Sequence, residues 1–216
     1  MNLRKLLYPF SIVYDGVTRL RNYAYDNQWL DSTQYEIPVI SVGNLSVGGT
    51  GKSPMIEYLV SFLREEYTIA VLSRGYKRKT KGFLEVQTAS TAAEVGDEPL
   101  QIKKKFPSIT VAVCADRRTG IDKLKNKAEL ILLDDAFQHR KVRPALQIVL
   151  TAFDDLFLDD LLLPAGNLRE SSKGKQRADI IIVTKCPINL PYATQNEIQY
   201  RIGLHTQQRL FFSSIS

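Results

Sequence analysis

The segment Ser46-Val-Gly-Gly-Thr-Gly-Lys-Ser53 constrains the fold of this chain more than any other feature. It follows an apolar, β-branched run that predicts a strand at residues 37–42, and it precedes a run that predicts a helix at residues 54–66. A strand, a glycine-rich loop and a helix in this order are typical of a phosphate-binding loop. The alternative is a flexible glycine turn before a helix, and Ser46 stands where the strict motif has glycine.

The residue types in this loop suit a triphosphate. The glycines at 48, 49 and 51 permit unusual backbone dihedrals, so amide N–H groups can point at phosphate oxygens beside the positive end of the following helix. We expect Lys52 to reach the terminal phosphates and the Ser53 hydroxyl to bind Mg²⁺. The predicted nucleotide-binding residues are Ser46, Val47, Gly48, Gly49, Thr50, Gly51, Lys52 and Ser53.

A pair of acids supplies the second feature that a phosphate loop requires. The run Leu130-Ile-Leu-Leu-Asp134-Asp135 places two carboxylates directly after four apolar residues, at the end of a predicted buried strand. Asp134 is the candidate metal residue, directly or through water, and Asp135 is a candidate contact for Lys52 or a metal-bound water. The alternative is a surface turn that carries two acids.

The rest of the chain alternates apolar strands with helices. Of its 216 residues 44% are hydrophobic and 24% are charged, which excludes a disordered chain and allows one sizeable core. We predict one α/β domain at residues 31–216, with a mostly parallel sheet flanked by helices. The predicted strands are residues 37–42, 68–72, 83–87, 109–113, 130–133, 146–150, 180–184 and 210–212, and the predicted helices are residues 54–66, 99–105, 117–127 and 195–201.

Residues 1–30 form a separate segment in which apolar and aromatic residues are mixed with Arg and Lys. This pattern predicts an amphipathic helix in a membrane interface, and the alternative is a helix that packs on the domain. The uncharged run 6–14 is shorter than the roughly 20 residues that a spanning helix needs. Pro9 is expected to kink or start the helix.

The charge balance and the cysteines restrict the partners. A formal charge of +6 and basic clusters at residues 77–81, 103–105 and 140–143 suit an anionic leaflet. A solvated surface and nonspecific nucleic-acid binding are the alternatives, and nucleic acid is disfavoured because no RNA-binding aromatic signature accompanies the clusters. Cys114 and Cys186 have neither metal-ligand nor disulfide-scaffold spacing, so we expect two small buried residues in a reducing compartment.

A GTPase of this architecture reads guanine with an [NT]-K-x-D motif after a late strand. The segment Thr184-Lys-Cys-Pro187 begins this motif and ends in proline, so the guanine-reading carboxylate is absent. A membrane-associated GTPase or targeting protein is therefore the weaker alternative, and ATP is the expected nucleotide.

The motifs together resemble one family, the tetraacyldisaccharide 4′-kinases (lipid A 4′-kinases) of Gram-negative envelope synthesis. Ser46 agrees with that family's loop, and Ala136 stands where the family usually has glycine. The similarity covers essentially the whole chain. It is carried by Val42-Gly-Asn-Leu-Ser-Val-Gly-Gly-Thr-Gly-Lys-Ser-Pro54, Leu72-Ser-Arg-Gly-Tyr76, Gly96-Asp-Glu-Pro99, Ala115-Asp-Arg117, Asp134-Asp-Ala-Phe-Gln-His139 and Leu163-Pro-Ala-Gly-Asn-Leu-Arg-Glu170.

This resemblance implies transfer of the γ-phosphoryl of ATP, with Mg²⁺, to the 4′-hydroxyl of a tetraacylated glucosamine disaccharide 1-phosphate. It implies a peripheral enzyme at the cytoplasmic face of the inner membrane, and no protein partner is expected. By the same resemblance Asp97 is the proton acceptor and Glu98 a contact of Mg²⁺ or water. Read without the family, Gly96-Asp-Glu-Pro99 predicts a helix start with Asp97 as its cap.

The family motifs also mark a set of secondary candidates. Arg74 and Arg117 are candidates to neutralise nucleotide phosphate or to grip the lipid phosphate, although isolated arginines are usually surface charges. Gln138 and His139 follow the acid pair and are expected to orient its loop, and an ordinary structural histidine is the alternative for His139. The predicted substrate-side residues are Asn44, Arg74, Arg117, Gln138, His139, Arg169 and Glu170.

The resemblance also implies that family members continue into a C-terminal part that helps to bind nucleotide and contributes a histidine partner for the catalytic aspartate. His205 matches no motif. We therefore expect this chain to retain phosphate binding with weak or absent turnover, and an inactive nucleotide-binding fragment is the third alternative.

Overall fold

The computed structural model describes residues 3–214, and the chain divides into two compact units. The first, called here the acid-pair unit, comprises Ser32–Gly43 and Lys52–Leu146. The second, called the loop unit, comprises the residues up to Asp31, Asn44–Gly51 and the residues from Gln147 onward. The phosphate loop therefore belongs to one unit, and the lysine that follows it belongs to the other.

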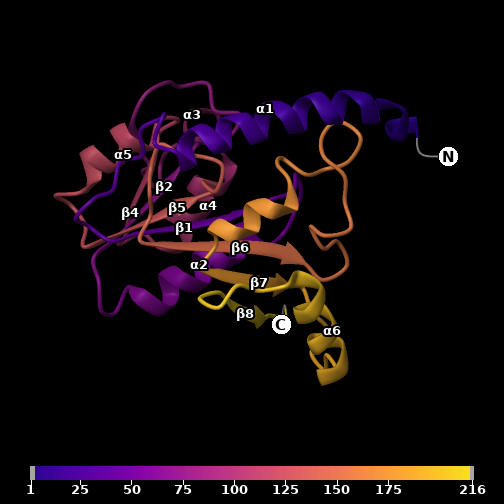
Figure 1. Ribbon diagram of the computed structural model, residues 1–216. Helices are drawn as coiled ribbons and strands as arrows, with labels where there is room; N and C mark the ends of the chain where they lie inside the picture. Colours follow the sequence, from indigo (N-terminus) through magenta and orange to yellow (C-terminus); the bar gives the residue numbers. More distant parts are fainter. Residues whose placement is uncertain (1–2, 215–216) are drawn as a thin grey trace. The chain divides into compact units, whose positions relative to one another are not determined.

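The acid-pair unit contains a sheet in the order β3-β4-β2-β5-β1 (Figure 1). The neighbours β4-β2, β2-β5 and β5-β1 are parallel, whereas the short β3 joins β4 antiparallel at the edge. Because parallel strands end at the same edge, the residues that follow β2, β4 and β5 come close to one another. The strands are β1 (Val39–Asn44), β2 (Ile69–Ser73), β3 (Leu84–Glu85), β4 (Thr110–Val113) and β5 (Leu130–Asp134).

Helices cover this sheet and complete its core. Every residue of β2 and β5 is buried, which explains why both strands are continuously apolar up to their last residue. Leu72 of β2, Ile121 and Leu124 share one core cluster, each no more than 1% exposed. The helices are α2 (Lys52–Leu63), α3 (Ala92–Val95), α4 (Asp97–Lys105) and α5 (Arg117–Leu124).

The loop unit has three parallel strands in the order β6-β7-β8. The first of them, β6, starts at the last residue of the acid-pair unit. Its elements are the 3₁₀ helix η1 (Leu3–Leu7), α1 (Tyr8–Asp26), β6 (Leu146–Ala152), the 3₁₀ helix η2 (Ser172–Arg177), β7 (Ile180–Thr184), α6 (Tyr192–Ile202) and β8 (Arg209–Phe212).

The predicted α/β fold with a mostly parallel sheet is confirmed, and each predicted strand and helix is present with ends shifted by up to three residues. Hydrophobic periodicity did not predict the one-turn helix α3 or the 3₁₀ helix η2, because neither is long enough to show a helical repeat. Cys114 and Cys186 are both buried and free, as predicted.

Helix α1 begins beside Pro9, which lies in its first turn and breaks neither the helix nor its hydrogen bonds. Ser11 is its one buried residue, whereas large apolar side chains are exposed along it. Within residues 3–214, no helix combines the length and apolarity that crossing a bilayer requires. The exposed apolar residues of η1 and α1 are Leu6, Leu7, Tyr8, Phe10, Ile12, Val13, Val17, Leu20 and Tyr23.

The basic cluster at 103–105 is partly used within the fold. Lys105 forms an ion pair with Glu57 of α2 at 2.6 Å. Lys103 donates hydrogen bonds to the carbonyl groups of Pro107 and Ile109, both at 2.8 Å. Two of the three lysines thus hold local structure, which weakens the prediction that this cluster serves an anionic surface.

Candidate active site

The acid pair lies beside the lysine of the phosphate loop. The Nζ atom of Lys52, the first residue of α2, is 3.7 Å from Oδ1 of Asp135, and the two side chains are 13% and 32% exposed. Asp135 has a φ angle of 48°, in the left-handed region that residues other than glycine seldom adopt. Such a backbone conformation persists only where the surrounding structure holds it, and this turn aims the Asp135 carboxylate at Lys52.

Asp134 is the most unusual carboxylate of this unit. It ends β5, is 1% exposed, and has a carboxylate atom, Oδ1, without a hydrogen-bond partner among the described residues. Burial raises the pKa of Asp134 to about 6, and the neighbouring charges of Glu98 and Asp135 add to the shift. The Ser73 hydroxyl and Lys52 oppose it. Lys52, Ser73 and Glu98 therefore all lie within electrostatic or hydrogen-bonding range of this buried acid.

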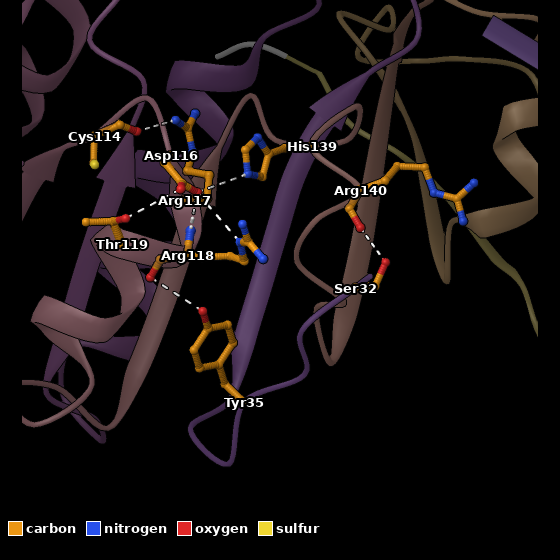
Figure 2. Close-up of polar contacts among 9 residues, drawn as sticks. All are labelled: Ser32, Tyr35, Cys114, Asp116, Arg117, Arg118, Thr119, His139 and Arg140. Carbon is orange, nitrogen blue, oxygen red and sulfur yellow. Dashed lines mark hydrogen bonds and ion pairs between the residues drawn. The ribbon is translucent and has the colours of Figure 1, made fainter. Parts of the chain in front are cut away.

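Arg117, whose hydrogen bond to Cys114 is drawn in Figure 2, holds the backbone beside the acid pair. It opens α5 and is 2% exposed, and its guanidinium donates to the carbonyl oxygens of Cys114 at 2.7 Å and of Asp134 at 3.0 Å. These carbonyls stand at the carboxyl ends of β4 and β5. Burial lowers the pKa of Arg117 to about 10, against the attraction of Asp134. The structure thus gives Arg117 a role in holding two strand ends, while a direct phosphate contact stays a prediction.

His139 lies on the other side of Asp116, which caps α5 by accepting a hydrogen bond from the Arg118 amide at 3.1 Å (Figure 2). The Nε2 atom of His139 is 4.0 Å from Asp116 Oδ1 and is buried without a hydrogen-bond partner in the described part of the chain. Burial, followed by the charge of Arg117, lowers the pKa of His139 to about 4. His139 is therefore neutral at pH 7 and packs at the end of the loop that begins with the acid pair.

The start of α4 lies against the loop after β2. A side chain at Gly96 would meet the carbonyl oxygen of Tyr76 at 3.1 Å, and one at Gly75 would meet the carbonyl oxygen of Val95 at the same distance. Both glycines have positive φ angles, 91° and 71°, so they are required by conformation as well as by space. The contact brings Asp97 and Glu98 beside the loop that carries the exposed Arg74.

The alternative prediction that Asp97 caps α4 is wrong. The capping position is occupied by Gly96 without a side-chain hydrogen bond, and Asp97 is the first helical residue. Since Gly96 adopts a φ angle that disfavours other residues, the helix starts there on conformational grounds and leaves the Asp97 carboxylate exposed. A catalytic role for Asp97 stays a prediction.

The phosphate loop is held within the loop unit. Asn44 is fully buried and donates to the Thr50 hydroxyl at 2.9 Å, which links the two ends of the loop. The N–H group of Val47 donates to the Asn167 carbonyl at 2.7 Å, and that of Thr50 donates to Gly48 at 3.0 Å. Within residues 3–214, no backbone hydrogen bond engages the N–H groups of the three loop glycines. These glycines, rather than Val47, offer donors to an anion.

Two residues that the sequence analysis did not assign to this loop contact it. The Thr184 hydroxyl, buried at the end of β7, donates to the carbonyl oxygens of Thr50 at 2.8 Å and Thr151 at 3.2 Å. Lys185 has a φ angle of 58°, and its ammonium group lies 3.8 Å from where a side chain at Gly49 would begin. In the sequence, Thr184 and Lys185 stood out only as the start of an incomplete guanine-reading motif. Their position at the end of a predicted strand was the signal that could have placed them beside the loop.

Arg169 and Glu170 are tied into the loop unit by their other groups. The Arg169 amide donates to the Leu45 carbonyl at 2.7 Å. Glu170 is 3% exposed and accepts hydrogen bonds from Arg177 at 2.8 and 2.9 Å and from Asn22 at 3.0 Å. Arg169 thus supports the segment that leads into the phosphate loop, and Glu170 ties its own segment to α1 and η2. The predicted substrate contacts stay predictions, as do those of Arg74 and Gln138.

A parallel α/β sheet, a glycine-rich loop between strand and helix, and a lysine beside an acid at the next strand end define a phosphate-loop nucleotide-binding protein. Comparison with known proteins narrows this class to one family. Residues 3–213 match the Tetraacyldisaccharide-1-P 4'-kinase family, and the chain belongs to that family.

Its relatives include proteins named tetraacyldisaccharide 4'-kinase. One from Flavobacterium johnsoniae is 52% identical over 99% of this chain, and one from Flavobacterium psychrophilum is 56% identical over 99%. The chain spans 64% of the length of each. A solved LpxK structure from Aquifex aeolicus in complex with ATP is also similar, with a TM-score of 0.79 and 32% identity, covering 98% of this chain and 81% of that one.

Proposed function

We propose that these residues carry the nucleotide-binding and phosphoryl-transfer functions of a tetraacyldisaccharide 4'-kinase. The reaction moves the γ-phosphoryl of ATP to the 4′-hydroxyl of a tetraacylated glucosamine disaccharide 1-phosphate. The observation that supports it best is the 3.7 Å contact of Lys52 with Asp135, next to the buried Asp134. Family membership and the ATP bound to the related Aquifex protein support it further.

The donor set fits Mg²⁺. The ion binds hard oxygen ligands and typically takes one or two protein carboxylates together with substrate phosphates. Asp134 offers a buried carboxylate oxygen without a hydrogen-bond partner, and Ser53 offers a hydroxyl in the first turn of α2. The described residues contain no group of three or more His, Cys, Asp or Glu side chains that could hold a metal ion, so the remaining ligands would come from the nucleotide and water. When bound, Mg²⁺ would neutralise charge on the transferred phosphoryl group.

Lys52 and Asp97 then have separate tasks. Lys52 binds and orients the terminal phosphates, while Asp135 fixes the position of its ammonium group. Asp97, exposed at the positive end of α4, accepts the proton of the sugar hydroxyl. The bond between that oxygen and the γ-phosphorus forms as the bond from the γ-phosphorus to the bridging oxygen breaks, and ADP leaves. Glu98 lies close enough to raise the pKa of Asp134 and completes the acidic surroundings.

The outward face of α1 supports a peripheral location on the cytoplasmic face of the inner membrane. Its apolar side chains are 63–67% exposed at Phe10, Val13, Val17 and Leu20. An interfacial helix buries such a face at the boundary between headgroups and acyl chains. The acylated substrate would be held in the same leaflet.

The two other candidate functions have less support. A GTPase would need the guanine-reading carboxylate, and Pro187 stands in its place. An inactive nucleotide-binding fragment would share the phosphate loop and would differ only in turnover, so the same assay separates it from the kinase.

The test is transfer of radiolabelled γ-phosphate to the acylated disaccharide, with nucleotide affinity measured in parallel. It is run with the 216-residue chain and with one extended to the length of its relatives. Lys52→Ala should abolish nucleotide binding, whereas Lys123→Ala, an exposed lysine of α5, should leave it unchanged. Equal ATP affinity in wild type and Lys52→Ala would remove the phosphate-loop assignment, and transfer without lipid selectivity would remove the substrate assignment.

A further inference from the structure

Residues 162–170, called here the strap, lie along the first half of the phosphate loop. The Arg169 amide donates to the Leu45 carbonyl, and the Val47 amide donates to the Asn167 carbonyl, both at 2.7 Å. Between these two bonds Ser46 and Leu168 form an antiparallel bridge. The strap thus pairs with the loop as an added strand would, and the position of one sets the position of the other.

Helix α1 holds the strap from the opposite direction. The Tyr14 hydroxyl donates to the Arg169 carbonyl at 2.8 Å. The Ser11 hydroxyl donates to the Leu162 carbonyl at 3.0 Å and accepts from the Ala165 amide at 3.1 Å. Asn22 donates to Glu170 at 3.0 Å. Residues 11, 14 and 22 lie on one side of a helix with 3.6 residues per turn, so a single face of α1 makes all these contacts.

Further contacts fix both ends of the strap. Near its start, Arg4 donates to the Asn167 side chain at 3.0 Å and to the Pro164 carbonyl at 3.2 Å. At its end, the buried Glu170 forms an ion pair with Arg177 of η2. Figure 1 shows an orange loop reaching the N-terminal half of α1.

Burial makes this chain of contacts rigid. Ser11, Ala165, Leu168 and Glu170 are each no more than 6% exposed. A buried hydrogen-bonding group that loses its partner is costly, so the bonds to α1 oppose displacement of the strap. Leu45 and Ser46, on the loop side, are also buried. The backbone path from Tyr14 to the phosphate loop therefore contains only two links, the Arg169 carbonyl and the Arg169 amide.

We infer that Ser11 and Tyr14 of α1 are positioning residues for the phosphate loop, acting through the strap, so that attachment of α1 raises the affinity for a triphosphate nucleotide. This inference rests on the proposed function of the loop. It assigns α1 a task within the nucleotide site that is separate from any contact of its outward face. Because coupling between two equilibria is reciprocal, nucleotide binding stabilises the attachment of α1 to the same extent.

The experiment compares two tyrosines of one helix. Tyr14→Phe removes the hydroxyl that bonds Arg169 and leaves the ring in place. Tyr8→Phe makes the same change at an exposed ring whose hydroxyl has no hydrogen bond within the described residues. The affinity for Mg²⁺ and a non-hydrolysable ATP analogue is measured by calorimetry. We expect Tyr14→Phe to weaken binding about 3- to 10-fold, the effect of one net hydrogen bond, and Tyr8→Phe to leave it unchanged.

A second readout separates positioning from general destabilisation. Amide hydrogen exchange across residues 8–26 is followed with and without the analogue. In wild type and Tyr8→Phe the analogue should slow exchange in α1, and in Tyr14→Phe this protection should shrink. Ser11→Ala, which removes both bonds of that hydroxyl to the strap, should repeat the Tyr14→Phe result.

The outcomes are distinct. A wild-type chain that binds no nucleotide overturns the proposed function and this inference together. A wild type that binds, with Tyr14→Phe and Ser11→Ala binding equally tightly and no protection of α1, overturns the inference alone. Weaker binding by Tyr14→Phe and Tyr8→Phe alike also overturns it, because the loss would not depend on the strap.

Discussion

Replacing Arg117 by methionine tests whether this arginine supports the strand ends or contacts a substrate phosphate. In the structure its guanidinium is 2% exposed and donates to the carbonyls of Cys114 and Asp134. Methionine has a similar length and no donor, so two buried carbonyls would lose their partner. Each such loss costs about 1 to 3 kcal/mol. Because the variant no longer buries a charge, part of that cost is offset.

We therefore expect Arg117→Met to lower the free energy of unfolding by about 1 to 4 kcal/mol. The control is Arg118→Met on the same helix, whose side chain is 38% exposed and 4.0 Å from Asp116. An exposed ion pair contributes about 0 to 1 kcal/mol, so the control should lie close to wild type. The assay is urea denaturation followed by circular dichroism at pH 7.

A further consequence concerns the acid pair. The Asp134 carbonyl held by Arg117 belongs to the same residue as the candidate metal carboxylate, so the variant should also bind Mg²⁺ and nucleotide more weakly. An Arg117→Met protein as stable as wild type, with normal nucleotide affinity and a raised KM for the lipid alone, would refute the supporting role. It would restore Arg117 as a contact of the lipid phosphate.

Three further predictions concern catalysis, pH and the membrane. Asp97→Asn, in a chain extended to the length of its relatives, should lower kcat about 100- to 10,000-fold with little change in ATP affinity; an equal loss of affinity in calorimetry would make Asp97 a binding residue. Burial lowers the pKa of His139 to about 4 from 6.5, so the unfolded chain binds more protons between these values and the stabilising contribution of neutral His139 is lost as the pH falls from 6.5 towards 4. His139→Gln should therefore lose less stability than wild type over that range, and parallel urea midpoints in the two proteins would contradict this. Val13→Asp, at a side chain that is 67% exposed, should reduce sedimentation with anionic vesicles without lowering the melting temperature, and unchanged sedimentation would dispose of the outward face of α1 as the membrane contact.

Local sequence patterns were sufficient for the strands and the longer helices, and for the position of the phosphate loop and the acid pair. Strands such as β2 and β5 are buried along their whole length, so their apolar runs mark them without any tertiary information. The phosphate loop is also local, because its glycines, lysine and serine are consecutive. The acid pair could be connected to it because parallel strands end at one edge, and the contact of Lys52 with Asp135 agrees with that prediction.

Side-chain roles that depend on distant partners required the tertiary structure. The family motifs marked Arg117 and Glu170 as substrate-side candidates, and the structure shows that both are buried with partners that the sequence could not pair. The cap prediction for Asp97 failed because the backbone angle of Gly96 is set by its contact with the loop after β2. The strap is more than 100 residues away in sequence from the phosphate loop that it supports, so neither hydrophobic periodicity nor the spacing of a motif links the two segments. Composition and local order therefore determined which strands and longer helices form and where the phosphate loop lies. Long-range packing decided which polar groups are buried and hold the backbone, because burial and pairing are properties of the assembled chain.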